Sequence, residues 1–552
     1  MISTEDPHSH SHSNNYPSET TFESSPNPSM NLTRNKRDEF LIDIRKKKNS
    51  NLLLQKRVKL SSLSDHKPHE PTTLTIMQEE IPRPSSAEPQ IDPRLLERLK
   101  IERDNFYNHL RNEAYDDLTI TVTFLRICTI DRPDPENIEN PEAALAGVPG
   151  RYIMDLGIVP ELIGLLSERF SQYSELQIEC AWLLTNLSAD SGAVIEYLAQ
   201  NGIIRALAQC FRYSGNQNLH ENAIWALANI SGEKDLAYRD EILEQDVLNL
   251  VVRELYKGAK SLKYYEISAW LISNLVRGRP YPPFNQIAKA FGALSYLVDY
   301  EDYAIKCFAL QSLIYLTEQP EEEHIKSFIS NDLMQKVFKC LINEEKGEED
   351  GRYHVTIGAV KIMANLANIE GALQKDLYKM LLRNISDILK RDDDLLKEEI
   401  CKLLINILGV YSENYDYVMD YAIMSTLVEL IAKDQENVKI QATSCLRYFL
   451  QNCSSNHAMA LIEEGLVNVL LENLQASNSK LIETSLKALS KVFDYGMLLQ
   501  EGEMGVNPLV MAVKQNGMQG LVENLQNHPE MSVRSSAAVL WDRFFDDYDE
   551  GF

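Results

Sequence analysis

Three stretches of the chain share one pattern: AWLLTNLSADSG at residues 181–192, IWALANISGEKD at residues 224–235 and AWLISNLVRGRP at residues 269–280. Each places a Trp four residues before an Asn, and successive Trp residues are 43 and 45 residues apart. The residues between Trp and Asn are small or apolar, which is typical of a helix that is buried on one side. Helical units repeated at this interval predict an α-solenoid, in which each unit stacks only on its neighbours.

Weaker copies of the pattern continue towards the C-terminus. Counted from Trp270, they lie at Gln311, Lys361, Lys402 and Ser444, at intervals of 41, 50, 41 and 42 residues. The interval of 50 residues contains an acidic insertion. Apolar residues recur at three- and four-residue spacing from about Leu95, and no stretch alternates with the period of two of a β-strand. We therefore expect one continuous solenoid, of armadillo or HEAT type, rather than several globular domains.

Charge is distributed unevenly along the 552 residues. The chain carries 55 Lys and Arg against 81 Asp and Glu, a net charge of −26, which disfavours direct binding to nucleic-acid phosphates and suits a basic partner. Residues 34–60 reverse this sign with ten basic and three acidic residues. The basic ones are Arg34, Lys36, Arg37, Arg45, Lys46, Lys47, Lys48, Lys56, Arg57 and Lys59.

The segments around this basic stretch are low in apolar residues. Residues 1–33 are rich in Ser, Pro, Asn and His, and we expect them to be disordered. Residues 61–94 are rich in Pro and read as a flexible linker, and residues 546–552 form an acidic tail.

Several classes of function are disfavoured. The eight cysteines form no CxxC pair, and the chain contains no P-loop, no nucleophile elbow and no metal-ligand spacing. No apolar run approaches the ~18 residues of a membrane-spanning helix, and the N-terminus does not resemble a signal peptide. We therefore expect a soluble, intracellular protein that is not an enzyme, needs no cofactor or metal, and inserts into no membrane.

The Trp and Asn of each copy share one helix face, because residues four apart lie one turn above each other. Stacked helices would repeat this face as a ladder of indoles beside carboxamides. Indole faces hold the stems and charged heads of Lys or Arg, and carboxamides can hydrogen-bond an extended backbone. The pattern thus predicts a groove that binds an extended, Lys-rich peptide. A lone copy would be read instead as a core Trp and a helix-capping Asn, but three copies in register favour binding.

The region from about Tyr115 to Asp547 resembles the armadillo domain of the importin-α family. RGRPYPPF at residues 277–284 resembles the stretch after the family's fourth repeat motif, and residues 507–550 resemble its last repeat and acidic end. TRNKRDEFLIDIRKKKNSNLLLQKRVKL at residues 33–60 resembles its importin-β-binding segment. The resemblance implies an all-α, right-handed armadillo-repeat solenoid of about ten repeats over residues 95–545, preceded by a disordered basic arm.

The resemblance also implies a function, that of a nuclear import adapter that shuttles between cytoplasm and nucleus. Cargo with a basic nuclear localisation signal would lie in the groove, and importin-β would bind residues 34–60. Without importin-β, Lys56, Arg57 and Lys59 would fold back into the groove. An export receptor would meet the C-terminal repeats near Asp546–Glu550.

The groove residues implied by the resemblance fall into two sets. The major set is Trp182, Asn186, Asp190, Trp225, Asn229, Glu233, Trp270, Asn274 and Arg277. The minor set is Tyr315, Asn365 and Asn406.

This sequence departs from the family at several of these places. Glu233 stands for an Asp that grips the main lysine of the signal, and Ile195 replaces a Thr of that pocket, a loss for which Asp190 would compensate. Lys402 and Ser444 replace Trp residues in the minor set, so we expect preference for monopartite signals. Residues 139–155 are extra sequence that we expect to form a loop. The competing interpretations are an armadillo scaffold, or a chaperone for basic proteins, without a role in transport.

Overall fold

The computed structural model describes residues 91–130, 147–318, 320–342, 349–367, 369, 375–410, 414–498 and 507–546. Within these ranges the regular elements are helices, and none is a strand. The chain divides into two compact units, and the larger one, Ile91–Thr129 with Val148–Phe552, contains all of these helices. The predicted tail, basic arm and most of the linker, residues 1–90, lie outside the described residues.

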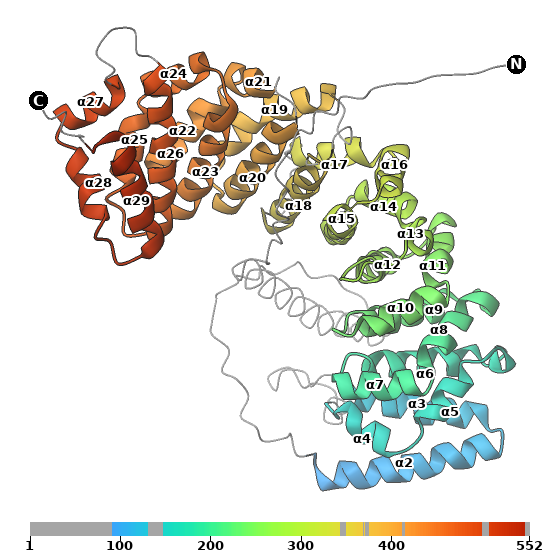
Figure 1. Ribbon diagram of the computed structural model, residues 1–552. Coiled ribbons are helices and arrows are strands. Elements are labelled where there is room, and N and C mark those ends of the chain that lie inside the picture. Colours follow the sequence, from blue (N-terminus) through green and yellow to red (C-terminus); the bar gives the residue numbers. More distant parts are fainter. Residues whose placement is uncertain are drawn as a thin grey trace, which may run out of the picture. The chain divides into compact units, whose positions relative to one another are not determined.

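Ten of the described helices form a continuous row in which each packs against the next, so that neighbours in space follow the order of the chain (Figure 1). We call this row the inner row. Its members are α3 (Tyr115–Cys128), α6 (Ser174–Leu187), α9 (Gln217–Ser231), α12 (Leu262–Leu275), α15 (Tyr303–Glu318), α18 (Glu349–Ala367), α20 (Asp394–Val410), α23 (Glu436–Asn452), α26 (Ser479–Leu498) and α29 (Met531–Phe544).

A second row of helices packs on the first, one on each inner helix from α6 onwards. These outer helices are α5 (Val159–Leu165), α8 (Ile203–Tyr213), α11 (Val247–Tyr256), α14 (Ala290–Val298), α17 (Leu333–Ile342), α19 (Lys375–Leu389), α22 (Ile423–Lys433), α25 (Leu466–Asn473) and α28 (Gln519–Leu525). The all-α solenoid of armadillo repeats is thereby confirmed, because ten inner helices require about ten repeats.

Short helices complete the repeats, and a long helix, α2 (Pro93–Arg111), packs on α3 at the N-terminal end. The short helices are α4 (Gly150–Asp155), the 3₁₀ helix η3 (Glu168–Phe170), α7 (Gly192–Gln200), α10 (Leu236–Glu244), α13 (Phe284–Ile287), α16 (Glu322–Ser330), α21 (Asn414–Asp420), α24 (Ser455–Glu463) and α27 (Pro508–Gln515).

The core lies between the two rows. In most inner helices the two residues after the Trp position are buried and apolar, as Leu183 and Leu184 are in α6 and Leu403 and Leu404 are in α20, whereas α15 has the buried Ser312 at the first of these places. Each such Leu contributes about 1.5–3 kcal/mol by leaving water. Since most repeats bury such a pair, the core continues along the solenoid without a single centre.

A tight turn with a left-handed residue leads into most of the described outer helices, although not into α14, which follows Lys289 in the right-handed region. Gly202 and Gly465 occupy this place before α8 and α25 with φ of 80° and 96°. In other repeats a residue with a side chain takes the same conformation, as Asp246 does before α11 and Ala422 before α22, with φ of 61° and 53°. The left-handed geometry before the outer helices therefore recurs even where glycine is absent.

The extra sequence at residues 139–155 is not wholly a loop, which corrects the expectation from sequence. Its last six residues form α4. The backbone N–H of Gly150, the first residue of this helix, donates to Asp190 Oδ2 at 2.6 Å. A carboxylate at a helix N-terminus satisfies a free N–H and opposes the positive end of the helix dipole, so a residue 40 positions away allows this short helix to form.

We expect Ala422→Gly to stabilise the protein. A left-handed conformation costs an L-residue about 1–2 kcal/mol, which exceeds the extra backbone entropy that glycine loses on folding. The urea midpoint, followed by circular dichroism, should rise by an amount equivalent to about 0.5–1 kcal/mol. Ala206→Gly, inside α8, is the matched control and should lower the midpoint, because glycine disfavours a helix interior. A lower midpoint for Ala422→Gly would contradict this interpretation.

Candidate functional site

The three Trp/Asn pairs lie on consecutive helices of the inner row, α6, α9 and α12. We call these six residues the Trp/Asn ladder. The sequence placed each pair on one helix face, and the solenoid brings the three pairs side by side. The indoles are nearly buried, with relative exposures of 9% for Trp182, 1% for Trp225 and 7% for Trp270.

The chain's own side chains cover one face of each indole. The guanidinium of Arg126, on α3, lies 3.9 Å from the ring centre of Trp182, and the ammonium of Lys263, on α12, lies 3.8 Å from that of Trp225. The ring of Phe308, on α15, lies 6.5 Å from that of Trp270. Both cations sit within the range of cation–π attraction. The indoles therefore already perform, inside the protein, the chemistry that we predicted for a basic ligand.

Buried carboxylates accompany these internal cations. Arg126 Nε donates to Glu179 Oε2 at 2.6 Å, and both side chains are nearly buried. Lys263 Nζ lies 3.7 Å from Glu221 Oε1. Each indole of the first two pairs thus faces an ion pair, in which the acid stabilises the cation that the ring attracts.

Sequence reasoning missed Arg126, Glu179, Glu221 and Lys263. For Lys263 a signal existed, because it precedes Trp270 by seven residues, or two helical turns, on the same face of α12. For Arg126 none existed, since only the packing of α3 on α6 brings it to Trp182.

The ladder Asn residues hydrogen-bond the preceding inner helix. Asn274 Nδ2 donates to the carbonyl of Ala228 at 2.9 Å, and Asn229 Nδ2 to that of Thr185 at 3.3 Å. In each case the acceptor residue directly precedes the Asn of its own helix. Asn186 makes the equivalent bond to Arg126 O at 3.5 Å and a second to Thr129 Oγ1 at 3.1 Å. The Asn side chains therefore have a structural role, because their amide groups join successive repeats.

The side-chain oxygens of the ladder Asn residues do not all form hydrogen bonds. Asn186 Oδ1 and Asn274 Oδ1 are buried and have no hydrogen-bond partner among the described residues, and the same holds for Trp270 Nε1. An unpaired buried acceptor costs about 1–3 kcal/mol.

Asp190 and Glu233, the two expected acids, lie in different surroundings. Asp190 is exposed, and its oxygens accept from the N–H groups of Gly150 and Ser191 at 2.6 and 2.7 Å. A Cβ at Gly150 would lie 3.0 Å from Asp190 Oδ2, so a larger residue there would need the Asp190 side chain to shift by a few tenths of an ångström. Glu233 is half-buried, and its carboxylate forms no salt bridge with any described residue. Glu233 is thus the acid of this pair that remains available to a cation.

The guanidinium of Arg277 caps the C-terminal end of a helix. Its Nη2 donates to the carbonyl of Ser231 at 2.9 Å and also to the carbonyl of Glu233. These carbonyls belong to the C-terminal end of α9, where a cation offsets the negative end of the helix dipole.

The minor set continues along the inner row. Asn365 Nδ2 donates to Thr317 Oγ1 at 3.1 Å and Asn406 Nδ2 to Ala364 O at 2.8 Å, which repeats the inter-helix bond of the ladder. Tyr315, at the Asn position of α15, is buried and borders a cleft of about 320 Å³. The other residues of this cleft are Val276, Tyr281, Pro282, Pro283, Ile287, Leu316, Glu321 and His324.

Other kinds of site find no support in the described part of the chain. It contains no group of three or more His, Cys, Asp or Glu side chains that could hold a metal ion. None of its helices combines the length and apolar character that a bilayer crossing requires.

We expect Asn274→Asp to destabilise the protein, because the carboxylate keeps the shape of the side chain but cannot donate to Ala228 O. Leaving a fully buried charge unpaired should lower stability by about 2–4 kcal/mol, measured as the urea midpoint. Asn406→Asp is the matched control, since it loses the same bond at a half-exposed place and should cost less. Equal effects of the two substitutions would show that burial of the inter-repeat bond does not matter.

Comparison with known proteins agrees with this geometry. The family model for the armadillo/beta-catenin-like repeat matches residues 151–189 and 193–232. An engineered protein of known crystal structure superposes with a TM-score of 0.61 at 18% identity, over 81% of this chain and 98% of that one. At this identity the likeness shows the fold alone.

Curated relatives carry importin α names. Importin subunit alpha-1b of Oryza sativa subsp. japonica is 21% identical over 436 residues, which cover 78% of this chain and 76% of the relative. Importin subunit alpha-2 of Arabidopsis thaliana is 26% identical over 308 residues, 56% of this chain and 51% of the relative. Importin subunit alpha-8 of the same plant is 34% identical over 185 residues, 34% of this chain and 39% of the relative. The chain thus spans about half or less of the last two. It is a divergent relative of the importin α subunits, built as a solenoid of armadillo repeats.

Proposed function

We propose that this protein is a nuclear import adapter that binds basic nuclear localisation signals on its Trp/Asn ladder and shuttles between cytoplasm and nucleus. The observation that carries the proposal is the pairing of internal cations with the ladder indoles at 3.9 and 3.8 Å. It supports the proposal because these rings already attract cations, which is the chemistry that the Lys or Arg side chains of a basic signal would use. The importin α names of its relatives point to the same role.

An extended peptide would use two further features of the ladder. The carboxamides of the ladder Asn residues would hydrogen-bond the peptide backbone. The carboxylate of Glu233 would hold a lysine of the signal. Because Arg277 binds the backbone at Glu233, it would position this acid and not contact the peptide itself.

The second part of the proposal concerns residues 34–60, which lie outside the described residues. We propose that importin-β binds this basic arm, and that Lys56, Arg57 and Lys59 compete with cargo for the ladder when importin-β is absent. Competition within one chain acts through a high effective concentration, so it lowers the apparent affinity for cargo without any new contact. An export receptor at the C-terminal repeats is part of the same proposal.

The alternatives are a scaffold outside transport and a chaperone that shields basic proteins. A scaffold needs the solenoid but not the ladder, and a chaperone needs the ladder but not an importin-β-binding arm. The two experiments below separate these possibilities.

The first experiment tests the ladder. A fluorescein-labelled monopartite Lys-rich peptide should bind the full chain, and Trp182→Ala should weaken binding about tenfold, equivalent to about 1.4 kcal/mol, measured by fluorescence anisotropy. Trp182→Phe keeps an aromatic face and should retain part of the affinity. Trp541→Ala, on α29, is the control and should bind as the wild type does. Equal affinity of the Trp182→Ala protein, with its fold confirmed by circular dichroism, would refute binding by the ladder.

The second experiment tests the arm. Deleting residues 34–60 should abolish importin-β binding and raise the affinity for the signal peptide, because the competing cations are gone. Deleting residues 1–33 is the matched control, since it removes the tail and keeps the arm, and it should change neither measurement. Retained importin-β binding without residues 34–60 would contradict the proposal for the arm. Peptide binding on the ladder combined with no importin-β binding at all would favour the chaperone.

A further inference from the structure

The inner row changes its chemistry after α15. At the position that carries Trp in α6, α9 and α12, α18 carries Lys361, α20 carries Lys402 and α26 carries Lys487. The register is set by the core, because the two residues that follow each lysine are buried and apolar, as Leu403 and Leu404 are after Lys402 and Ala488 and Leu489 are after Lys487. The lysines therefore occupy the face that the indoles occupy at the N-terminal end.

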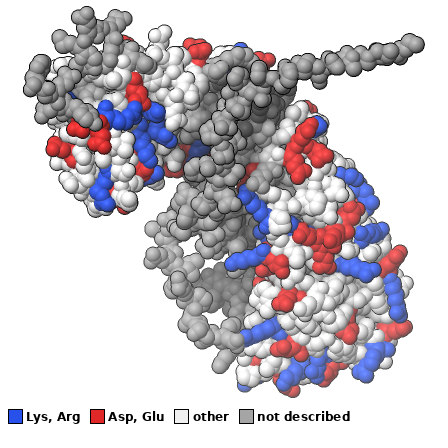
Figure 2. Space-filling model, viewed as in Figure 1, with Lys and Arg blue, Asp and Glu red and all other residues white. Residues whose placement is uncertain are grey.

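Two more lysines of α26 belong to the same face. Lys480 precedes Lys487 by seven residues and Lys491 follows it by four, spacings that place them on one side of a helix. We call Lys361, Lys402, Lys480, Lys487 and Lys491 the lysine surface. The side chains of Lys402, Lys480 and Lys487 are 46%, 65% and 50% exposed. Figure 2 shows Lys and Arg gathered over the C-terminal helices, in the part of the molecule that is orange and red in Figure 1.

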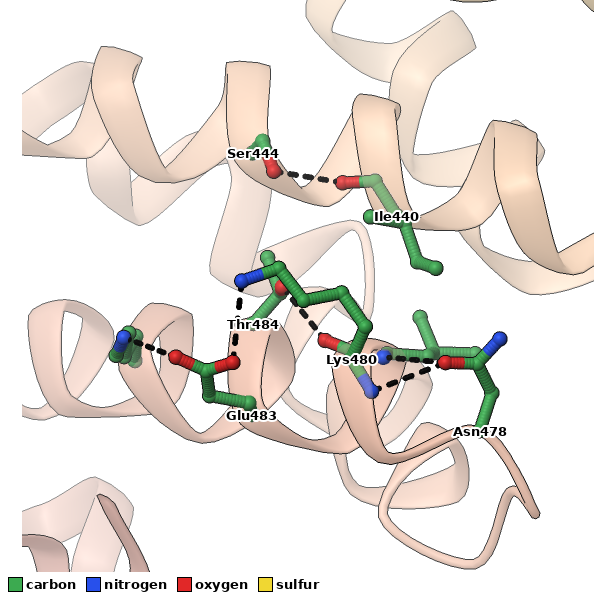
Figure 3. A network of polar contacts seen from close by, with 8 residues as sticks. Ile440, Ser444, Asn478, Lys480, Glu483 and Thr484 are labelled. Carbon is green, nitrogen blue, oxygen red and sulfur yellow. Dashed lines mark hydrogen bonds and ion pairs between the residues drawn. The ribbon is translucent and has the colours of Figure 1, made fainter. Parts of the chain in front are cut away.

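Three acids near these lysines are each shared by two cations. Glu399 lies 3.7 Å from Lys361 Nζ and 3.1 Å from Lys402 Nζ. Glu483 lies 3.1 Å from Lys480 Nζ and also pairs with Lys487, and Asn478 caps the start of the same helix (Figure 3). Asp494 is shared in the same way by Lys491, at 3.6 Å, and Arg543 of α29, at 2.6 Å.

This sharing leaves positive charge uncompensated. Burial alone would raise the pKa of Glu483, but hydrogen bonds from Lys487 and Lys480 outweigh it and lower the pKa below its usual value, so the acid stays ionised. Even then one carboxylate neutralises only one of its two cations. Glu398, beside Glu399, is a further acid on this face, and burial raises its pKa. With Glu398 counted, two acids face Lys361 and Lys402, and the excess of cations lies on α26 and α29, where Lys480, Lys487, Lys491 and Arg543 share Glu483 and Asp494.

We propose that the lysine surface on α18, α20 and α26 binds an acidic, extended segment of a partner protein. This site has the opposite polarity to the Trp/Asn ladder and does not depend on the import proposal. Inner helices lie about 8–10 Å apart, and an extended peptide rises about 3.3 Å per residue, so each helix meets about every third residue. Asp or Glu opposite α18, α20 and α26, with any residue opposite Ser444 of the intervening α23, would therefore match the lysines.

The same geometry favours a peptide over a nucleic acid. Glu399 and Glu483 lie among the lysines, where they would repel an unbroken row of phosphates. A peptide can place neutral residues opposite these acids. Asn365 and Asn406, on α18 and α20, supply amide groups of the kind that bind a peptide backbone.

The test is fluorescence anisotropy of a labelled 12-residue peptide with Glu or Asp at every third position, added to the full chain. The peptide should bind, more weakly as salt rises, and Lys402→Glu with Lys487→Glu should weaken binding at least tenfold. The neutral pair Lys402→Gln with Lys487→Gln should have a smaller effect. Lys326→Glu with Lys390→Glu changes two lysines of 70% and 62% exposure outside the inner row and should leave binding unchanged.

Other outcomes overturn the proposal. Unchanged affinity in the Lys402→Glu, Lys487→Glu protein would place the acidic peptide elsewhere, and a single-stranded oligonucleotide that competes equally well would indicate a general polyanion surface. Binding that appears only after deletion of residues 546–552 would make the chain's own acidic tail the occupant.

A monopartite Lys-rich peptide, measured with the same proteins, should bind the double variant at least as well as the wild type. Its failure to bind any of them would count against the import proposal alone.

Discussion

The hydrogen bond from a ladder asparagine to the preceding inner helix is the contact on which the rest of the inner face depends. Asn229, Asn274 and Asn406 each donate to the carbonyl directly before the equivalent residue of the helix they pack on. A bond of this kind fixes both the height and the rotation of one repeat on the next. Because a solenoid has only neighbour contacts, this local register is what aligns side chains along its length.

Once the register is set, the inner helices present equivalent positions along one face. The sequence places different side chains at these positions. Indoles occupy the Trp position in α6, α9 and α12, where buried acids and internal cations surround them. Lysines occupy it in α18, α20 and α26, where Glu399 and Glu483 are each shared by two lysines. The backbone is the same at both ends, so the difference in binding that we propose comes from the side chains alone.

The internal cations also set a limit on how the ladder can work. Arg126 and Lys263 hold one face of Trp182 and Trp225, so an incoming lysine must use the remaining surface of these rings or displace a residue that is itself paired with an acid. Displacing Arg126 would leave Glu179 buried without its partner, which is costly. Only 9% of Trp182 and 1% of Trp225 is exposed, so a ligand meets little of either ring unless a neighbouring side chain moves.

The sequence alone determined the fold class and the ladder, because a repeat of 43 to 45 residues with apolar residues at helical spacing leaves few alternatives to stacked helices. It also placed Trp and Asn on one face and the buried pairs on the other. Tertiary structure decided what each polar side chain binds. Asp190 caps α4, Arg277 caps α9 and Arg126 lies on Trp182, because the partners come from other repeats, 40 to 60 residues away. Periodicity along a chain shows which face a residue occupies, whereas only packing shows which neighbour it meets there.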